Sequence, residues 1–253
     1  MKNNNLGIII QARTGSTRLP SKMILPFYNG QGIFEILLTR LIDAGLGDIV
    51  VVATTNQQQD DIIYDIAHRK NIKTFRGDEN DVLDRFIQTA SQYHIDQIIR
   101  VCADNPFLDM LALKELINFG THTPADYISY CTSTHTPTIK THYGFWAEYT
   151  SLSALKTVKS LTTESLYHEH VTNYIYTHPT NFKIELHPIP IEIEQHDIRL
   201  TLDTLTDFQI QQTIFETIYK NNPQFQIKDI LNYLNEHTDY YTIMRETIKA
   251  NQK

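Results

Sequence analysis

The chain has 253 residues, of which 41% are hydrophobic and 10% aromatic, and a chain of this size can bury a sizeable core as one long domain. Its 22 basic residues stand against 29 acidic ones, so the formal net charge is -7. This acidic balance argues against non-specific binding to nucleic acid or to an anionic membrane surface. We expect a folded globular protein in which any basic cluster is local and specific.

The sequence shows no sign of a targeting or membrane-spanning segment. The start "MKNNNLGIII" has no long apolar core, and no apolar run approaches the roughly 20 residues of a spanning helix. Cys102 and Cys131 are the two cysteines, and their spacing suits neither a metal site nor a disulfide framework. We therefore expect a soluble, cytoplasmic protein with buried free thiols.

Strand-like and helix-like segments alternate through the first half of the chain. Short apolar runs cover 6–10, 49–53, 73–75 and 97–101, and amphipathic stretches cover 33–45, 58–70 and 79–94. In the first amphipathic stretch Ile33, Leu37 and Leu41 recur at helical spacing. This alternation predicts an α/β fold in which helices cover both faces of a parallel sheet.

The pattern changes near Ala125. "ADYISY", a loop rich in Thr and His, and "YGFWAEYT" indicate strands outside the parallel series, so we expect a β-rich insertion at about 125–150. Helices are then predicted from Ser151, from Glu164, after Thr206 and after Gln226, with strands at 182–186 and 198–202. The chain contains no internal repeat and no Pro/Gly/Ser-rich linker, which favours a single domain over 1–253.

The loop after the first predicted strand carries the strongest functional signal. In "IIIQARTGSTRLPSKMI", the small residues are Gly15, Ser16 and Thr17, and the basic residues are Arg13, Arg18 and Lys22. Small residues let backbone N–H groups approach an anion, and basic side chains donate charge-assisted hydrogen bonds to phosphate. The spacing fits neither the P-loop nor the dinucleotide fingerprint, so the residues alone predict a phosphate site and leave a merely solvated basic loop as the alternative.

Two aspartates follow predicted strands. Asp104 comes after "IIRVCA" and Asp203 after "IRLTL", which would place both at the edge of the sheet where ligands bind. Mg²⁺ prefers one or two carboxylates together with water and phosphate oxygens. Each aspartate also precedes a predicted helix and could instead be its N-cap, and both interpretations stay open on the residues alone. Asp207 is expected at a helix start.

Several segments resemble one enzyme family. "IIQARTGSTRLPSKMI", "GDENDVLDRF", "IIRVCADNPFLD", "HEHVTNYIYTHPTNFKI" and "DIRLTLDTLTDFQI" are similar, in order, to segments of the cytidylyltransferases that make CMP-activated acidic sugars. The closest likeness is to the spore coat polysaccharide biosynthesis F group of CMP-KDO synthetase homologues. The resemblance extends to about residue 220 and implies a three-layer α/β/α nucleotidyltransferase fold, related to glycosyltransferase A and Rossmann folds, with a mixed sheet and a dimerisation insertion.

The resemblance also implies roles for individual residues. Arg13 and Lys22, with Arg18 close by, would grip the triphosphate of CTP, and Asp104 and Asp203 would bind catalytic Mg²⁺. The predicted nucleotide site further includes Ala12, Gly15, Ser16, Thr54 and Arg85. Asp84 would orient Arg85, and the insertion residues Tyr143 and Glu148 would face the acceptor.

These expectations describe an Mg²⁺-dependent, homodimeric enzyme. It would transfer CMP from CTP to an acidic sugar or a phosphorylated sugar or polyol for a surface glycan. Trp146 replaces an acidic residue common in related proteins, so the resemblance does not imply which acceptor is used. One alternative is a glycosyltransferase, although the sequence lacks their usual Asp-x-Asp motif. Another is a non-catalytic nucleotide-binding subunit.

His168 and His170 would point to different faces of a helix, so zinc binding is not expected.

Overall fold

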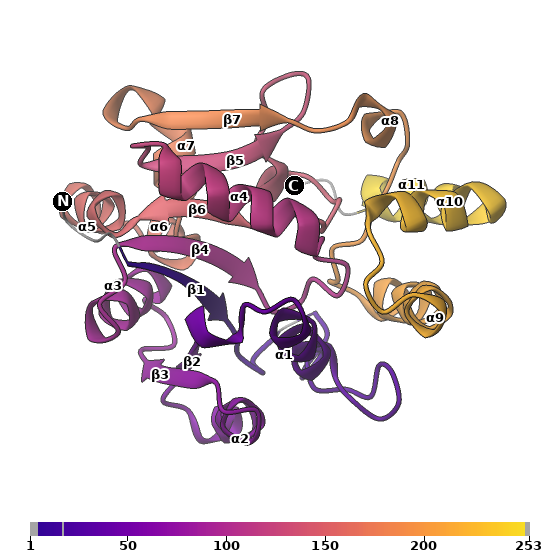
Figure 1. Ribbon diagram of the computed structural model, residues 1–253, viewed down its shortest axis with the longest axis horizontal. Coiled ribbons are helices and arrows are strands. Elements are labelled where there is room, and N and C mark those ends of the chain that lie inside the picture. Colours follow the sequence, from indigo (N-terminus) through magenta and orange to yellow (C-terminus); the bar gives the residue numbers. More distant parts are fainter. Residues whose placement is uncertain (1–4, 17, 251–253) are drawn as a thin grey trace.

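A seven-stranded sheet runs through the part of the chain that the computed structural model describes, residues 5–16 and 18–250 (Figure 1). Its strands are β1 (Leu6–Gln11), β2 (Val50–Thr55), β3 (Lys73–Gly77), β4 (Gln97–Cys102), β5 (Tyr127–Cys131), β6 (Glu148–Ser151) and β7 (Ile184–Pro188). The spatial order is β3-β2-β1-β4-β6-β5-β7. β6 is antiparallel to both of its neighbours, and the other pairs of this sheet are parallel. The predicted mixed sheet is confirmed.

Helices cover both faces of the sheet, and each face has its own apolar core. The helices are α1 (Ile33–Asp43), α2 (Asp61–Arg69), α3 (Val82–Gln92), α4 (Met110–His122), α5 (Leu152–Leu161), α6 (Ser165–Glu169), α7 (Asn173–Thr177), α8 (Ile191–Glu194), α9 (Leu205–Asn221), α10 (Ile227–Glu236) and α11 (Asp239–Ala250). Side chains of α1, α2, α4, α9 and α10 share one core, and side chains of α3 and α5 share the other. None of the helices in the described part of the chain has the length and apolar character that crossing a membrane requires.

Strand register brings the loops after β1, β2 and β4 to one edge of the sheet. β1 lies between β2 and β4, and Gln11 at its end is paired with Ala53 on one side and Cys102 on the other. Ile8 and Ile10 enter one core while Ile9 enters the other, because successive side chains of a strand point to opposite faces. The loops after β1, β2 and β4 therefore leave the sheet side by side.

The second half of the chain differs from the predicted elements. β5 and all but the last residue of β6 lie within 125–150, where an insertion was expected, and both strands are members of the central sheet. Only the last residues of the predicted strand 143–150 belong to β6, and the predicted helix from Glu164 is divided into α6 and α7.

The predicted strand 198–202 is wrong. Ile198, Leu200 and Leu202 are buried as a strand pattern suggests, but the segment is irregular. The N–H groups of Leu200 and Thr201 both donate to the single carbonyl of His142. The apolar alternation is therefore satisfied by packing against the core rather than by pairing in the sheet.

Candidate functional site

The loop after β1 is attached to the loop after β2 by a buried carboxylate. The N–H and Oγ1 of Thr14 donate to Asp60 Oδ1 at 2.7 and 2.6 Å, and Thr55 donates to the other oxygen of Asp60. Asp60 is fully buried. Its role was not predicted, because nothing in "QQQDD" distinguishes a loop anchor from a helix-start acid. The anchor fixes where the basic loop begins.

The small residues of this loop are packed among polar side chains. A Cβ atom added at Gly15 would lie 3.3 Å from both Gln59 Nε2 and Glu79 Oε1, so a larger residue would crowd them. The N–H of Ser16 donates to the Thr14 carbonyl at 2.8 Å, and is therefore used within the loop. Thr17 lies outside the described residues. Ala12 and Thr54 are buried, and their predicted place beside a nucleotide stays a prediction.

Four charged side chains meet beyond the ends of β1 and β4. Lys22 Nζ lies 2.6 Å from Asp104 Oδ2 and 3.9 Å from Asp203 Oδ1. Arg18 Nη2 lies 2.6 Å from Asp203 Oδ1. Lys22 is largely buried, with 12% of its side chain exposed. The structure thus brings together four predicted site residues that are separated by more than half of the chain.

The helix caps exclude one of the two interpretations of the aspartates. The N-cap of α4 is Asp109, whose side chain accepts from the Ala112 N–H. The N-cap of α9 is Thr204, which forms a capping box with Asp207. Neither Asp104 nor Asp203 is therefore an N-cap, and the predicted place of Asp207 at a helix start is confirmed. Asp104 follows β4 as expected, whereas Asp203 follows the irregular segment 198–202.

A buried arginine holds Asp203 in place. Arg199 donates to Asp203 Oδ2 at 3.1 Å and to both oxygens of Asp207 at 2.8 and 3.0 Å. The Asp203 N–H also donates to Asp207. Burial alone would raise the pKa of Asp207, but the bonds from Arg199 and two backbone N–H groups lower it below its usual value. Arg199 was not singled out from the sequence, since one arginine in an apolar segment carries no motif.

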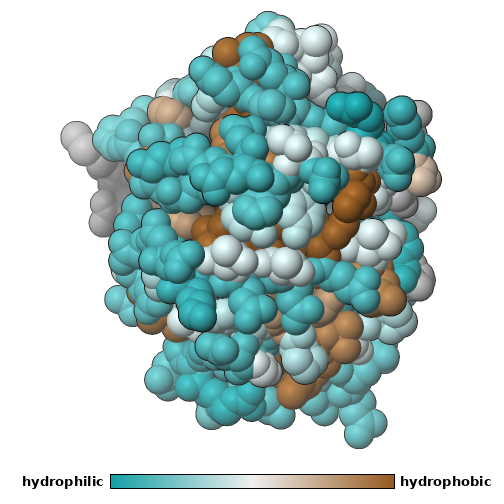
Figure 2. All heavy atoms as spheres, turned by 90° about the vertical axis from the view of Figure 1, so that its right-hand side faces the viewer, coloured by the Kyte–Doolittle hydropathy of each residue, from teal (hydrophilic) through white to brown (hydrophobic). Residues whose placement is uncertain are grey.

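A cavity of about 140 Å³ opens beside the two aspartates. Its lining residues are Cys102, Asp104, Asn105, Thr138, Ile139, Thr141, His142, Gly144, Trp146, Thr201 and Asp203. Gly144 has a φ of +72°, and a Cβ atom there would lie 2.5 Å from the Leu200 carbonyl oxygen. The loop between β5 and β6 thus packs directly on the segment that leads to Asp203. Figure 2 looks onto this side of the molecule, which is mostly hydrophilic with narrow hydrophobic strips.

Arg13 and Arg85 do not pair with Asp104 or Asp203, and they contact the loop 78–81 instead. Arg13 pairs with Glu79 at 3.9 Å and with Glu169 of α6 at 3.7 Å. Arg85 is 1% exposed and donates to the carbonyls of Asp78 and Glu79. Burial, followed by the nearby charge of Arg13, lowers the pKa of Arg85 to about 10. The two arginines therefore form a second basic group under and beside the loop 78–81.

The predicted pairing of Asp84 with Arg85 is wrong. Asp84 forms an ion pair with Lys159 of α5 and accepts from Gln88. Adjacent residues on a helix point about 100° apart, so Asp84 faces α5 while Arg85 faces the sheet. Arg85 is oriented by backbone carbonyls instead.

The "HEH" segment connects α6 to the loops of the site. His168 Nδ1 lies 3.0 Å from Asp81 Oδ2, and its Nε2 lies 3.1 Å from the Thr162 carbonyl oxygen. The neighbouring Glu169 pairs with Arg13. Across residues 5–16 and 18–250, no three His, Cys, Asp or Glu side chains gather in a group that could hold a metal ion.

His168 should make folding stability depend on pH. Burial alone would lower the pKa of His168, but its bonds to Thr162 and Asp81 raise it above its usual value. Both partners accept, so both ring nitrogens must carry protons. The contribution is complete below the unfolded pKa of about 6.5 and is lost as pH rises through the higher folded pKa. Urea unfolding should show a larger cost of His168→Gln at about pH 6 than at about pH 8.5; an equal cost at both would contradict the pairing.

Glu148 is a buried structural residue rather than one that faces the acceptor. Its carboxylate is paired with Arg100 and accepts hydrogen bonds from Tyr127 and Thr172. Glu148 is 2% exposed and Arg100 is 7% exposed. Tyr143, which was predicted to face the acceptor with it, packs edge-on against Trp146.

Glu148→Ala should lower the free energy of unfolding by about 3 kcal/mol, because it leaves the buried Arg100 charge without its partner. The change is measured by urea denaturation. Glu216→Ala on the exposed side of α9 is the matched control and should change stability little. Unchanged stability in Glu148→Ala, together with a higher KM for the acceptor, would instead support the original expectation.

Known proteins are similar to this chain in sequence and in fold. The family model described as Cytidylyltransferase matches residues 7–245. Uncharacterized protein MJ1063 of Methanocaldococcus jannaschii is 33% identical over 232 residues, 90% of each chain. The spore coat polysaccharide biosynthesis protein SpsF of Bacillus subtilis is 29% identical over 94% of this chain and 98% of its own. A cytidylyltransferase structure from Leptospira borgpetersenii has a TM-score of 0.82 at 28% identity, covering 94% of this chain and 96% of that one. The chain belongs to the cytidylyltransferase family of CTP-dependent nucleotidyltransferases.

Proposed function

We propose that this enzyme transfers CMP from CTP to an acidic sugar, or to a phosphorylated sugar or polyol, and releases pyrophosphate. The observation that carries the proposal is the meeting of Lys22, Arg18, Asp104 and Asp203 beyond the ends of β1 and β4. A role in surface-glycan synthesis is supported by the similarity to the Bacillus subtilis relative, a spore coat polysaccharide biosynthesis protein. We further propose a cytoplasmic homodimer that has no nucleic-acid or membrane partner.

The two aspartates fit a Mg²⁺ ion. Their carboxylates come from distant segments and lie around one cation, the ammonium of Lys22, at 2.6 and 3.9 Å. Two carboxylates lie within the one or two that Mg²⁺ prefers when phosphate and water complete its shell. When bound, the metal would offset the negative charge of the phosphates. Asp104 and Asp203 are the residues that would hold it, and the bonds from Arg199 keep Asp203 oriented.

The remaining chemistry follows from positioning and charge. An acceptor oxygen forms a new bond to the α-phosphorus of CTP, and the bond from that phosphorus to the departing pyrophosphate oxygen breaks. Any proton on the acceptor passes to water. Lys22 and Arg18 supply positive charge for the β- and γ-phosphates and hence for the leaving group, and Arg13 extends this charge toward α6. In this family of reactions, such positioning and neutralisation provide most of the rate enhancement.

The acceptor is expected on the side of the loop between β5 and β6. That loop lines the cavity beside Asp104 and Asp203 with hydroxyl, imidazole and indole side chains. Trp146 is 8% exposed and packs against Tyr130, Tyr143 and Phe145. Because this indole is fixed by its neighbours, it would form a rigid apolar wall against which one face of a sugar can pack.

Calorimetric titration with CTP, UTP, GTP and ATP, with and without Mg²⁺, tests the nucleotide assignment. CTP should bind most tightly, and its affinity should rise with Mg²⁺. Pyrophosphate release is then measured with CTP and a panel of acidic sugars and phosphorylated polyols. Preference for another nucleotide, or release that does not depend on any acceptor, would overturn the proposed reaction.

A further inference from the structure

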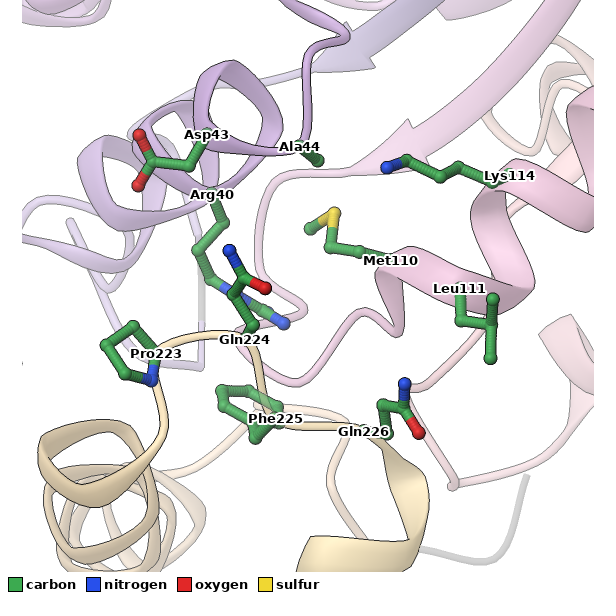
Figure 3. A pocket seen from close by; sticks show the side chains of 10 residues that line it. All are labelled: Arg40, Asp43, Ala44, Met110, Leu111, Lys114, Pro223, Gln224, Phe225 and Gln226. Carbon is green, nitrogen blue, oxygen red and sulfur yellow. The ribbon is translucent and has the colours of Figure 1, made fainter.

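A second and larger cavity lies on another side of the molecule. It has a volume of about 520 Å³ and lies between the end of α1, the start of α4 and the turn between α9 and α10 (Figure 3). Its lining residues are Arg40, Asp43, Ala44, Met110, Leu111, Lys114, Pro223, Gln224, Phe225 and Gln226. It has no lining residue in common with the cavity beside Asp104 and Asp203. The proposed transferase reaction uses none of these residues.

Arg40 lines this cavity, and one edge of its guanidinium group is buried without a hydrogen-bond partner among the described residues. The residue is 4% exposed, and its Nη1 donates to the Pro106 carbonyl at 2.8 Å. Its Nε and Nη2 have no hydrogen-bond partner within the described part of the chain. The guanidinium carbon lies 4.1 Å from the centre of the Phe225 ring. Burial lowers the pKa of Arg40 to about 10, although the nearby charges of Asp109 and Tyr219 act in the opposite direction.

Asp109 offsets the buried charge of Arg40 only in part, and Asp43, the one acid that lines the cavity, forms no ion pair with it. Both oxygens of Asp109 are occupied, one by the Ala112 N–H and the other by the Ile227 N–H. Among the described residues, no carboxylate lies within ion-pair distance of Arg40. A buried charge without a partner is unfavourable, so an anion that entered the cavity would relieve it.

The two unpaired nitrogens select the shape of that anion. Nε and Nη2 lie along one edge of the guanidinium and present parallel N–H groups, which match two oxygens of one phosphate or carboxylate group. Lys114 adds a second positive charge at the rim, and Met110 and Leu111 form the first turn of the 13-residue helix α4. Arg40, Lys114 and the positive end of the helix together favour a doubly charged anion.

We propose that this cavity is a second ligand site, which binds the phosphate group of a small molecule through the free edge of Arg40. The apolar side chains of Met110, Leu111, Pro223 and Phe225 leave a wall against which an organic body can pack. A phosphomonoester is therefore expected to bind more tightly than inorganic phosphate. Gln224 is exposed and lies in front of the guanidinium in Figure 3, and it is the side chain that must move to admit the ligand.

Methionine methyl NMR can observe the two sites separately. Met110 lines the proposed site, whereas Met23 follows Lys22 in the loop of the transferase site. The protein, labelled with 13C at its methionine methyls, is titrated with inorganic phosphate and in parallel with ribose 5-phosphate, both against sodium chloride of equal ionic strength. The Met110 signal, assigned by its loss in Met110→Leu, should shift saturably with both probes in wild-type protein and in Lys22→Ala.

Variants of the two basic residues complete the test. Arg40→Lys should weaken the Met110 response by roughly tenfold, because an ammonium cannot replace two parallel N–H donors. Lys114→Met, an exposed change that leaves the core intact, should weaken it by several-fold. Tighter binding of ribose 5-phosphate would identify an ester as the occupant, and equal affinities would identify free phosphate. The proposal would be overturned if Met23 alone responded or if Met110 showed no saturable shift. It would also be overturned if Arg40→Lys and Lys114→Met bound the probes as tightly as wild type does.

Discussion

Replacing Asp104 by asparagine should lower metal-dependent turnover by about a hundred- to a thousandfold, which is the usual loss when one electrostatic contact to a reacting group is removed. The amide has nearly the same shape as the carboxylate but is a neutral and much weaker ligand for Mg²⁺. Stability should change by less than about 1 kcal/mol, because the Asp104 side chain is 30% exposed and its ion pair with Lys22 is the contact that it loses. Steady-state pyrophosphate release across a range of Mg²⁺ concentrations measures the effect.

The matched control for this variant lies at the other end of the same strand. Asp96 precedes β4 and is exposed, so Asp96→Asn makes the same chemical change far from the proposed metal site. It should leave turnover within about twofold of wild type, as expected for an exposed substitution. If Asp104→Asn keeps wild-type turnover at every Mg²⁺ concentration, Asp104 is not a metal ligand.

The first half of the fold was predictable because its signals are local. Apolar runs and helical spacing within 6–101 depend only on neighbouring residues, and the structure places β1 to β4 with α1 to α3 in that order. The strand-end position of Asp104 follows from the same pattern, since parallel strands end at one edge of the sheet. Lys22 meets Asp104 because the loops after β1 and β4 leave adjacent strands.

The second half depends on contacts between distant segments. Ile198, Leu200 and Leu202 alternate as in a strand, yet the N–H groups of Leu200 and Thr201 donate to the His142 carbonyl rather than to a neighbouring strand. Glu148 resembles a ligand-facing acid in sequence, but Arg100 and Thr172 enclose it from β4 and from the segment before α7. Such partners lie dozens of residues away in the chain, and no local pattern of apolar residues predicts them.

The positions of Arg199 and Asp60 could not be predicted for a related reason. Each holds another residue of the site in place by hydrogen bonding. Arg199 donates to Asp203, and Asp60 accepts from Thr14. Supporting residues of this kind are selected by geometry rather than by a sequence motif. Their signal is a buried charge with several hydrogen bonds, which becomes visible only in the folded structure.

Lys22→Ala should weaken CTP binding by roughly 10- to 100-fold, as expected for the loss of a charge-assisted hydrogen bond, and CMP binding much less. Lys22 is one of the basic residues proposed to hold the β- and γ-phosphates, which CMP lacks. Calorimetry with both nucleotides measures the difference. Lys156→Ala on the exposed side of α5 is the control for removing a lysine. Equal losses for CTP and CMP would mean that Lys22 does not contact the β- and γ-phosphates.

The same variant should bind Mg²⁺ more tightly when no nucleotide is present. In the structure the Lys22 ammonium lies between the carboxylates that would hold the metal, 2.6 Å from Asp104 and 3.9 Å from Asp203, so a second cation there is repelled until Lys22 moves to the phosphates. Trp146, the single tryptophan, lines the adjoining cavity, and its fluorescence should report Mg²⁺ at lower concentration in Lys22→Ala than in wild type. In wild type, CTP should strengthen Mg²⁺ binding, because Lys22 then moves from the carboxylates to the phosphates. By linkage, Mg²⁺ should strengthen CTP binding by the same factor. If wild type binds free Mg²⁺ as tightly as the variant does, Lys22 does not lower the affinity for the metal, and metal and nucleotide bind independently.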